Sequence, residues 1–203
     1  MAEIEVVLLG VAVVAVSLVV AVGFMMQARR IRQHGRAGVS PTSWIAMISV
    51  LPLWFVYGIR MSDPGVVISN ALLWLPCALV IITWGRAAER RWASWPALVA
   101  LTAALISTAA ISPIALVGLA AIVLDLGTTW PQAYRAVRAK DLMGVSLGAW
   151  TFRASTLVLW FTYGVHLGLP HLALAAASKL IASLVVVVLV VTRRPPGLPL
   201  ATP

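Results

Sequence analysis

Long apolar stretches without charge alternate with short basic segments along the chain. A membrane-spanning helix needs roughly 20 apolar residues, and stretches of about that length or more run over 6–26, 42–59, 64–85 and 92–124. The last one is long enough for two helices. We expect Ser112–Pro113 to divide it, because proline lacks the amide donor and opens a helix more easily than it continues one. With further spans near 146–165 and 169–191, the pattern predicts seven membrane-spanning helices.

Composition agrees with an all-α membrane protein. The 203 residues are 62% hydrophobic and 10% charged, with a mean hydropathy of +1.00, which leaves too little polar surface to cover a water-soluble globule. The N-terminus has no positive segment before an apolar run of about 21 residues, so we interpret this run as a span and not as a signal peptide. The single cysteine, Cys77, lies within the third span and offers neither a disulfide nor a cysteine metal site.

The net charge of +9 is distributed by a simple rule. Basic residues follow spans one, three, five and seven, whereas only Arg60 lies on the opposite side. The twelve are Arg29, Arg30, Arg32, Arg36, Arg86, Arg90, Arg91, Arg135, Arg138, Lys140, Arg193 and Arg194. This one-sided pattern argues against a nucleic-acid surface, and the positive-inside rule places these loops in the cytoplasm. We therefore expect a multi-pass protein of a cell inner or plasma membrane, with the N-terminus outside and the C-terminus cytoplasmic.

The chain contains an internal repeat. An offset of 106 residues aligns 29–70 with 135–176 without gaps, and fourteen of the 42 positions are identical. Chance matches among apolar residues do not explain shared Trp, Tyr, Gly and Arg in one register. The repeat predicts two parallel copies of a three-span unit, with span four as the crossing that gives both copies the same orientation. The expected divisions are a first bundle over 1–85, a linker helix over 86–111, a second bundle over 112–192 and a tail over 193–203.

Several motifs occur twice or in a fixed order. They are Trp130-Pro131-Gln132 followed by AYRAVRAKDLMGVS, the span ends LWFVYG and LWFTYG, and Asp63 with Asn70 after the first of these ends. In this order they resemble the SWEET sugar transporters and their half-size bacterial relatives, the SemiSWEETs, within the PQ-loop group. The resemblance covers nearly the whole chain. It implies a 3+1+3 helix fold, a solute site between the two units, and alternating access by rocking of one unit against the other.

The resemblance also implies a substrate pocket. Its positions are Trp54, Trp160 and Asn70, with Ala176 where a second asparagine is expected. An indole face packs against the C–H face of a sugar ring, while an amide both donates and accepts hydrogen bonds to hydroxyls. The alternative is that these tryptophans are interface anchors, although Trp44 and Trp150 are expected to occupy that membrane belt.

An outer gate and a hinge are implied in the same way. The gate residues are Tyr57, Arg60 and Asp63, matched in the second copy by Tyr163, His166 and Leu169. An ordinary solvated pair is an equally good interpretation of Arg60 and Asp63. Pro131 with Gln132 is the expected hinge, because a proline removes a backbone hydrogen bond and kinks a helix. The first copy has Met25-Met26 at these positions, so the two hinges cannot be equivalent, and Pro52 is a candidate bend in span two.

Two charged residues lie inside predicted spans at similar depth. Asp125 and Lys179 are each about 16 to 20 Å below the outer membrane edge by helical rise. Because an isolated charge at that depth costs at least about 2.5 kcal/mol, we expect both to face the interior and each other. They form either a neutralised structural pair or a titratable site that couples transport to protons. Lys179 is also one helical turn from Ala176, while Arg153 is expected to extend to the membrane surface and is given no role.

These observations favour a facilitative sugar transporter that is passive and needs no cofactor. A proton-coupled carrier of amino acids or another small metabolite, acting through Asp125, is the alternative, and a non-transporting receptor or scaffold is a third. An enzyme is the weakest interpretation, because the sequence shows no catalytic residues and no spaced cluster for a metal. The expected partners are a small sugar and the lipid bilayer, without nucleic acid. Whether the chain forms a homo-oligomer stays open.

Overall fold

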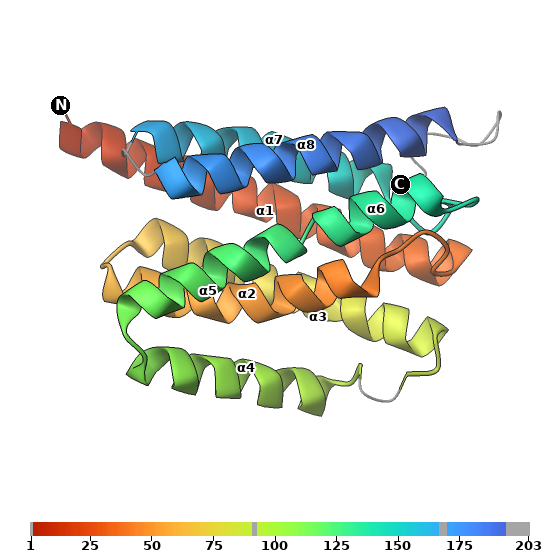
Figure 1. Ribbon diagram of the computed structural model, residues 1–203, viewed down its shortest axis with the longest axis horizontal. Helices are drawn as coiled ribbons and strands as arrows, with labels where there is room; N and C mark the ends of the chain where they lie inside the picture. The colour runs from red at the N-terminus through yellow and green to blue at the C-terminus, as the bar shows by residue number, and fades with distance from the viewer. Residues whose placement is uncertain (1, 91–92, 167–169, 194–203) are drawn as a thin grey trace.

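A computed structural model describes residues 2–90, 93–166 and 170–193, and this part of the chain is all-helical (Figure 1). The helices are α1 (Ala2–His34), α2 (Pro41–Arg60), α3 (Pro64–Ala87), α4 (Trp95–Ile111), α5 (Ile114–Gly127), α6 (Trp130–Arg138), α7 (Leu147–His166) and α8 (Pro170–Thr192). Five segments are long and apolar enough to cross a membrane: α1, α2, α3, α8, and α5 with α6 taken together. The predicted all-helical, membrane-type fold is confirmed to this extent. The fourth predicted span is the shorter helix α4, and the sixth is α7, which carries more polar side chains.

Two helix starts use the same local device. Ser40 precedes α2 and Asp63 precedes α3, and each side chain accepts a hydrogen bond from the backbone N–H three residues later. Pro41 and Pro64 follow directly, where the fixed backbone angle of proline suits the first helical turn and its missing N–H is not needed. Pro52 lies inside α2, which nevertheless continues as one helix to Arg60.

The helices pack in a closed circuit around a common centre. α1 packs against α3, α3 against α2, α2 against α5, the pair α5 and α6 against α8, α8 against α7, and α7 against α1. In each half, the last helix therefore contacts the other two. Helix α4 lies outside the circuit, where it contacts α2 and α3, and it forms one border of the molecule in Figure 1.

The fifth predicted span is interrupted. Helix α5 ends at Gly127, and α6 begins at Trp130 after a turn at Thr128 and Thr129. Pro131 lacks an N–H and cannot bond to the carbonyl of Gly127 four residues earlier, which weakens the helix at this point. Helix α1, at the same place in the first half, runs without a break.

The basic segments that follow four of the predicted spans gather at one end of the molecule. The C-terminal ends of α1, α3, α6 and α8 lie together, to the right in Figure 1, and they carry the basic segments after the first, third, fifth and seventh predicted spans. We call this the basic end, and the opposite end, where α2 finishes, the Arg60 end. Arg91 and Arg194 lie outside the described residues.

The expectation that Trp44 and Trp150 form a membrane belt is wrong. They are only 5% and 4% exposed. Trp44 packs edge-on against Phe24 with ring centroids 4.9 Å apart, and Trp150 lies 5.6 Å from the guanidinium carbon of Arg153. Both rings are covered because they lie near the first turns of α2 and α7, where the two halves pack closely.

Candidate functional site

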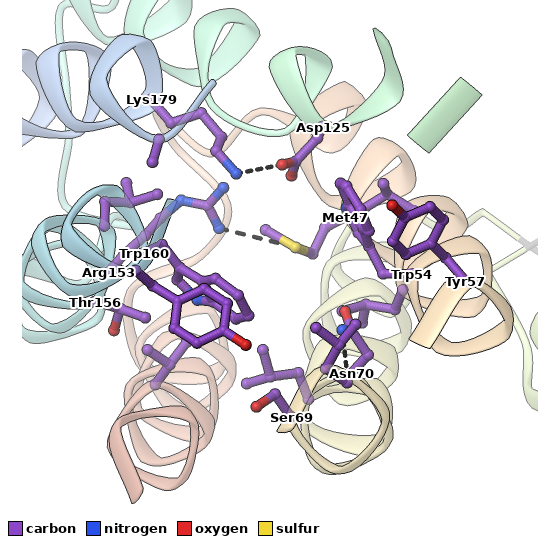
Figure 2. Close-up of a pocket in the computed structure, with 18 of the residues that line it drawn as sticks. Met47, Trp54, Tyr57, Ser69, Asn70, Asp125, Arg153, Thr156, Trp160 and Lys179 are labelled. Carbon is purple, nitrogen blue, oxygen red and sulfur yellow. Dashed lines mark hydrogen bonds and ion pairs between the residues drawn. The ribbon is translucent and has the colours of Figure 1, made fainter. Parts of the chain in front are cut away.

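A cavity of about 140 Å³ lies at the centre of the helix circuit. A cavity of roughly 150 Å³ is large enough to admit benzene, so this space suits a single six-membered ring. Nine predicted site residues line it: Trp54, Tyr57, Asp63, Asn70, Asp125, Trp160, Tyr163, Ala176 and Lys179. Figure 2 shows labelled side chains from α2, α3, α5, α7 and α8 surrounding this space. Arg60, Pro131 and Gln132 lie elsewhere.

Two matched aromatic pairs form opposite sides of the cavity. Trp54 meets Tyr57 edge-to-face, with centroids 5.4 Å apart and planes at 85°, and Trp160 meets Tyr163 with 5.6 Å and 79°. This geometry is favourable for aromatic rings and holds each indole in a fixed orientation. Within the described residues, neither indole N–H has a hydrogen-bond partner. Each tryptophan thus offers both a ring face and a donor to a bound molecule.

Uncharged polar side chains reach the cavity from α3 and also from α7, where the Thr156 hydroxyl donates to the Phe152 carbonyl. Asn70 donates its side-chain amide to the Val66 carbonyl at 2.7 Å, and its oxygen has no partner within the part of the chain described. The neighbouring Ser69 hydroxyl is buried and has no hydrogen-bond partner there either. Ala176 of α8 lines the cavity with a methyl group, so this second position supplies no amide.

Asp125 and Lys179 are in direct contact. The amine of Lys179 donates to a carboxylate oxygen of Asp125, and both side chains are buried on the cavity wall (Figure 2). The ion pair joins α5 to α8 within the second half of the chain. The amine is therefore held by Asp125, and no hydrogen bond links it to the position beside Ala176.

Arg153 is a cavity residue that the sequence analysis missed. It is 8% exposed and extends into the protein, not to the surface. One terminal nitrogen donates to the hydroxyls of Thr128 and Thr129 at 2.6 and 2.7 Å, and the other lies 3.9 Å from the sulfur of Met47. Its Nε has no hydrogen-bond partner among the residues that the structure describes. The signal was present, because an ionisable residue within an apolar span is a functional candidate by default.

At the basic end, Gln132 bridges the two halves. Its amide donates to the Gly38 carbonyl at 2.7 Å, and its oxygen accepts from the Ser40 N–H at 2.5 Å. The side chain is 1% exposed. Gln132 thereby fastens α6 to the loop between α1 and α2.

Gln27 makes the reciprocal bridge. Its amide donates to the Gly144 carbonyl and its oxygen accepts from the Ser146 N–H, both at 2.7 Å. Gly144 and Ser146 match Gly38 and Ser40 at the repeat offset of 106, but Gln27 and Gln132 are 105 apart. The match was missed because the gapless alignment begins only at Arg29. We call the four hydrogen bonds of these two residues the glutamine clasp.

The loops held by the clasp also touch directly. The Gly144 N–H donates to the Ala37 carbonyl at 3.2 Å. A Cβ atom at Gly144 would lie 2.6 Å from the carbonyl oxygens of Gly35 and Ala37, so a larger residue cannot fit without moving backbone. These contacts join the two halves at the basic end, farther from the cavity tryptophans than Asp125, Arg153 and Lys179.

At the Arg60 end, a single described hydrogen bond joins side chains of the two halves. The Tyr163 hydroxyl donates to Asp63 at 3.1 Å, while the other oxygen of Asp63 caps α3. Arg60 donates to the carbonyls of Ala109 and Ser112, so it holds α2 to α4 and makes no ion pair with Asp63 among the described residues. Leu169 lies outside the described residues.

No protein-family model and no curated protein matches the chain. The function of the cavity is therefore inferred from its geometry and from the motifs that resemble the SWEET transporters. The geometry combines three features: a ring-sized space, aromatic and polar groups on its wall, and contacts between the two halves at both ends.

Proposed function

We propose that this protein is a facilitative transporter that carries a small sugar across a membrane by alternating access between two three-helix units. The units are α1–α3 and α5–α8, with α5 and α6 as one broken helix and α4 as the linker. The observation that carries the proposal is the ring-sized cavity on the boundary of the units, with contacts between the units at both ends. A carrier needs such a site, reached first from one side and then from the other.

The pairing of helices supports the 3+1+3 arrangement. In the first unit α3 contacts both α1 and α2, and in the second α8 contacts both α7 and the pair α5 and α6. The contacts between units are matched as well, because α1 meets α7 where α5 meets α2. Together with the fourteen identical positions, these contacts favour two parallel copies and seven crossings.

The cavity wall suits a sugar. Trp54 and Trp160 offer indole faces for the C–H surface of a ring, and Asn70 and Ser69 offer groups that pair with hydroxyls. Such binding needs no cofactor. Transport then follows the substrate gradient.

The two sets of contacts between the units are the proposed gates. Opening the basic end requires release of the glutamine clasp, whereas opening the Arg60 end requires release of Asp63 from Tyr163. The interruption at Thr128 and Thr129 is the proposed hinge, since it lets α6 move relative to α5. By the positive-inside rule the basic end faces the cytoplasm, which leaves the N-terminus outside and the C-terminus inside, in an inner or plasma membrane.

Proton coupling is the second candidate, and the position of Asp125 on the cavity wall favours it. Protonation of the carboxylate would free Lys179, so the charge state could be linked to which end opens. In this case Asp125→Asn abolishes uptake driven by a proton gradient but retains exchange of labelled for unlabelled substrate. A passive carrier shows no dependence on the proton gradient.

The test is uptake into liposomes containing the purified full chain. A panel of monosaccharides, disaccharides and amino acids is offered with and without a proton gradient, and we expect saturable uptake of a monosaccharide or its derivative. Trp54→Ala and Trp160→Ala should each reduce uptake at least tenfold by removing a stacking surface, on the order of 1.4 kcal/mol. Trp95→Ala on α4, outside the cavity, is the matched control. If no solute moves under any gradient, the receptor or scaffold interpretation replaces this one.

A further inference from the structure

The charges on the cavity wall sum to zero, but they are unevenly placed. Arg153 and Lys179 bring two positive charges to the basic end of the cavity, and Asp125 brings one negative charge. Asp63 lies near the Arg60 end, where its oxygens accept from a backbone N–H and from Tyr163. Among the described lining residues, the charged cluster of Asp125, Arg153 and Lys179 therefore has one positive charge in excess.

Arg153 carries this excess. Lys179 is paired with Asp125, but the guanidinium contacts two threonine hydroxyls and a methionine sulfur, which are all uncharged. Its buried Nε–H has no acceptor within the described part of the chain. A buried cation without an anionic partner is costly, and a carboxylate relieves that cost because its two oxygens match the planar donors of a guanidinium.

We propose that the substrate is a sugar acid, a single ring whose carboxylate binds at Arg153 beside Lys179. The inference rests on the transport function proposed above and names its substrate class. Arg153 lies seven residues before Trp160 on α7, about 10 Å toward the basic end. The ring then lies between the tryptophans, and the carboxylate points toward the basic end.

The size and charge of the cavity narrow the choice further. A volume of about 140 Å³ suits a single ring. One excess positive charge matches a monoanion, whereas the ammonium group of an amino acid would be repelled by Arg153 and Lys179. A sugar phosphate carries nearly two negative charges at neutral pH and would leave the site over-neutralised.

The experiment compares counterflow of labelled glucuronate and labelled glucose in liposomes that contain the full chain. The measured quantity is the acid-to-glucose ratio of initial rates at the same low concentration. The wild type should prefer glucuronate. Lys179→Gln removes the excess positive charge of the cluster and should lower the ratio at least about tenfold, the loss expected for one charge-assisted contact.

The double variant Asp125→Asn/Lys179→Gln separates charge from local structure. It restores one excess positive charge and should recover most of the ratio, although the ion pair is still missing. Arg153→Gln in this double background removes the last positive charge and should lower the ratio again, without leaving an unpaired carboxylate. Arg135→Gln is the matched control, because it removes an exposed positive charge outside the cavity and should leave the ratio unchanged.

The outcomes separate the two proposals. If glucose is transported and glucuronate is not preferred, the inference that the substrate is a sugar acid is wrong and the transport function stands. The same holds if the acid-to-glucose ratio is unchanged in the charge variants. If neither is transported, the transport function fails. Tryptophan fluorescence titrations of the purified protein with glucuronate and with glucose then test whether the cavity binds a sugar acid. Tighter binding of glucuronate than of glucose would still support an acid site, and equal or absent binding would overturn it.

Discussion

The two halves of the chain differ in charge around the cavity. Three positions are apolar in the first half and charged in the second: Val20 and Asp125, Met47 and Arg153, and Leu73 and Lys179. The last two pairs follow the offset of 106, and the first lies seven residues before Gln27 and Gln132. The same helix positions pack with apolar residues in one half, so this helix arrangement does not itself require the charges. This difference is the reason to assign them to a ligand.

Uncharged polar groups show the opposite bias. Ser69 and Asn70 on α3 correspond to Ala175 and Ala176 on α8. At these two positions only the first half supplies groups that bind hydroxyls, although Thr156 of the second half also lines the cavity where the first half has Val50. By contrast, the glutamine clasp is nearly identical in both halves. Around the cavity the aromatic pairs are retained in both halves, whereas the charged positions and the amide of Asn70 are found in only one half.

The largest expected effect is on stability, when Lys179 in the second half is replaced by leucine, the residue at the matching position of the first half. Lys179→Leu alone leaves Asp125 buried without its partner and should lower the free energy of unfolding by about 3–5 kcal/mol. Asp125→Val/Lys179→Leu installs both first-half residues and should be close to the wild type or more stable, since apolar replacements of a buried pair often are. The measurement is an unfolding titration of the purified protein in detergent. A double variant as unstable as the single one would mean that the ion pair itself holds the fold.

Breaking the glutamine clasp should give the next largest effect, on closure of the basic end. The effect should be equal whether the glutamine of the first half or of the second half is replaced. Gln27→Leu or Gln132→Leu leaves a buried carbonyl and a buried N–H without partners, which should destabilise the closed basic end by about 1–3 kcal/mol. The readout is maleimide labelling of Ser43→Cys, a buried position in the first turn of α2, with Cys77→Ala making it the sole thiol. Labelling should be faster in both variants.

The exposed Gln33 provides the control for the clasp, because Gln33→Leu changes the same chemical group and breaks no contact between the halves. Its labelling rate should equal that of the parent. A large effect for Gln132 with none for Gln27 would contradict the symmetry of the clasp and would indicate that only the broken helix controls this end.

The sequence predicted more of the cavity than of its closures. Trp54, Trp160 and Asn70 were selected because the motifs that resemble the SWEET transporters imply these positions, and each lines the cavity. The pairing partner of Arg60 could not be predicted, because it depends on where α4 packs, and α4 has no counterpart in the repeat. In the structure, the guanidinium of Arg60 donates to the carbonyls of Ala109 and Ser112 on and after this helix.

Register explains the other misses. Pro131 indicated a weak point in the fifth span, but hydropathy alone could not show that the helix is broken before it, at Thr128 and Thr129. That break coincides with the one-residue difference in spacing between Gln27 and Gln132. Arg153 was missed for a related reason. Its distance from the end of α7 suggested a route to the surface, and only the contacts with these two threonines show that it turns inward.

The smallest expected effect compares Tyr57 with Tyr163 at the Arg60 end. Tyr163→Phe removes one hydrogen bond between the units, to Asp63, and should favour opening there by about 1 kcal/mol, roughly fivefold in population. Tyr57→Phe removes a hydroxyl that has no partner within the described residues, so it should have little effect. Labelling of Ser69→Cys in the Cys77→Ala background reports on this end and should be about fivefold faster only for Tyr163→Phe.

If the ends alternate, the same variant must also slow labelling of Ser43→Cys at the basic end, because one equilibrium governs both. Faster labelling at both ends would instead indicate that the units loosen together, and alternating access would not describe this protein.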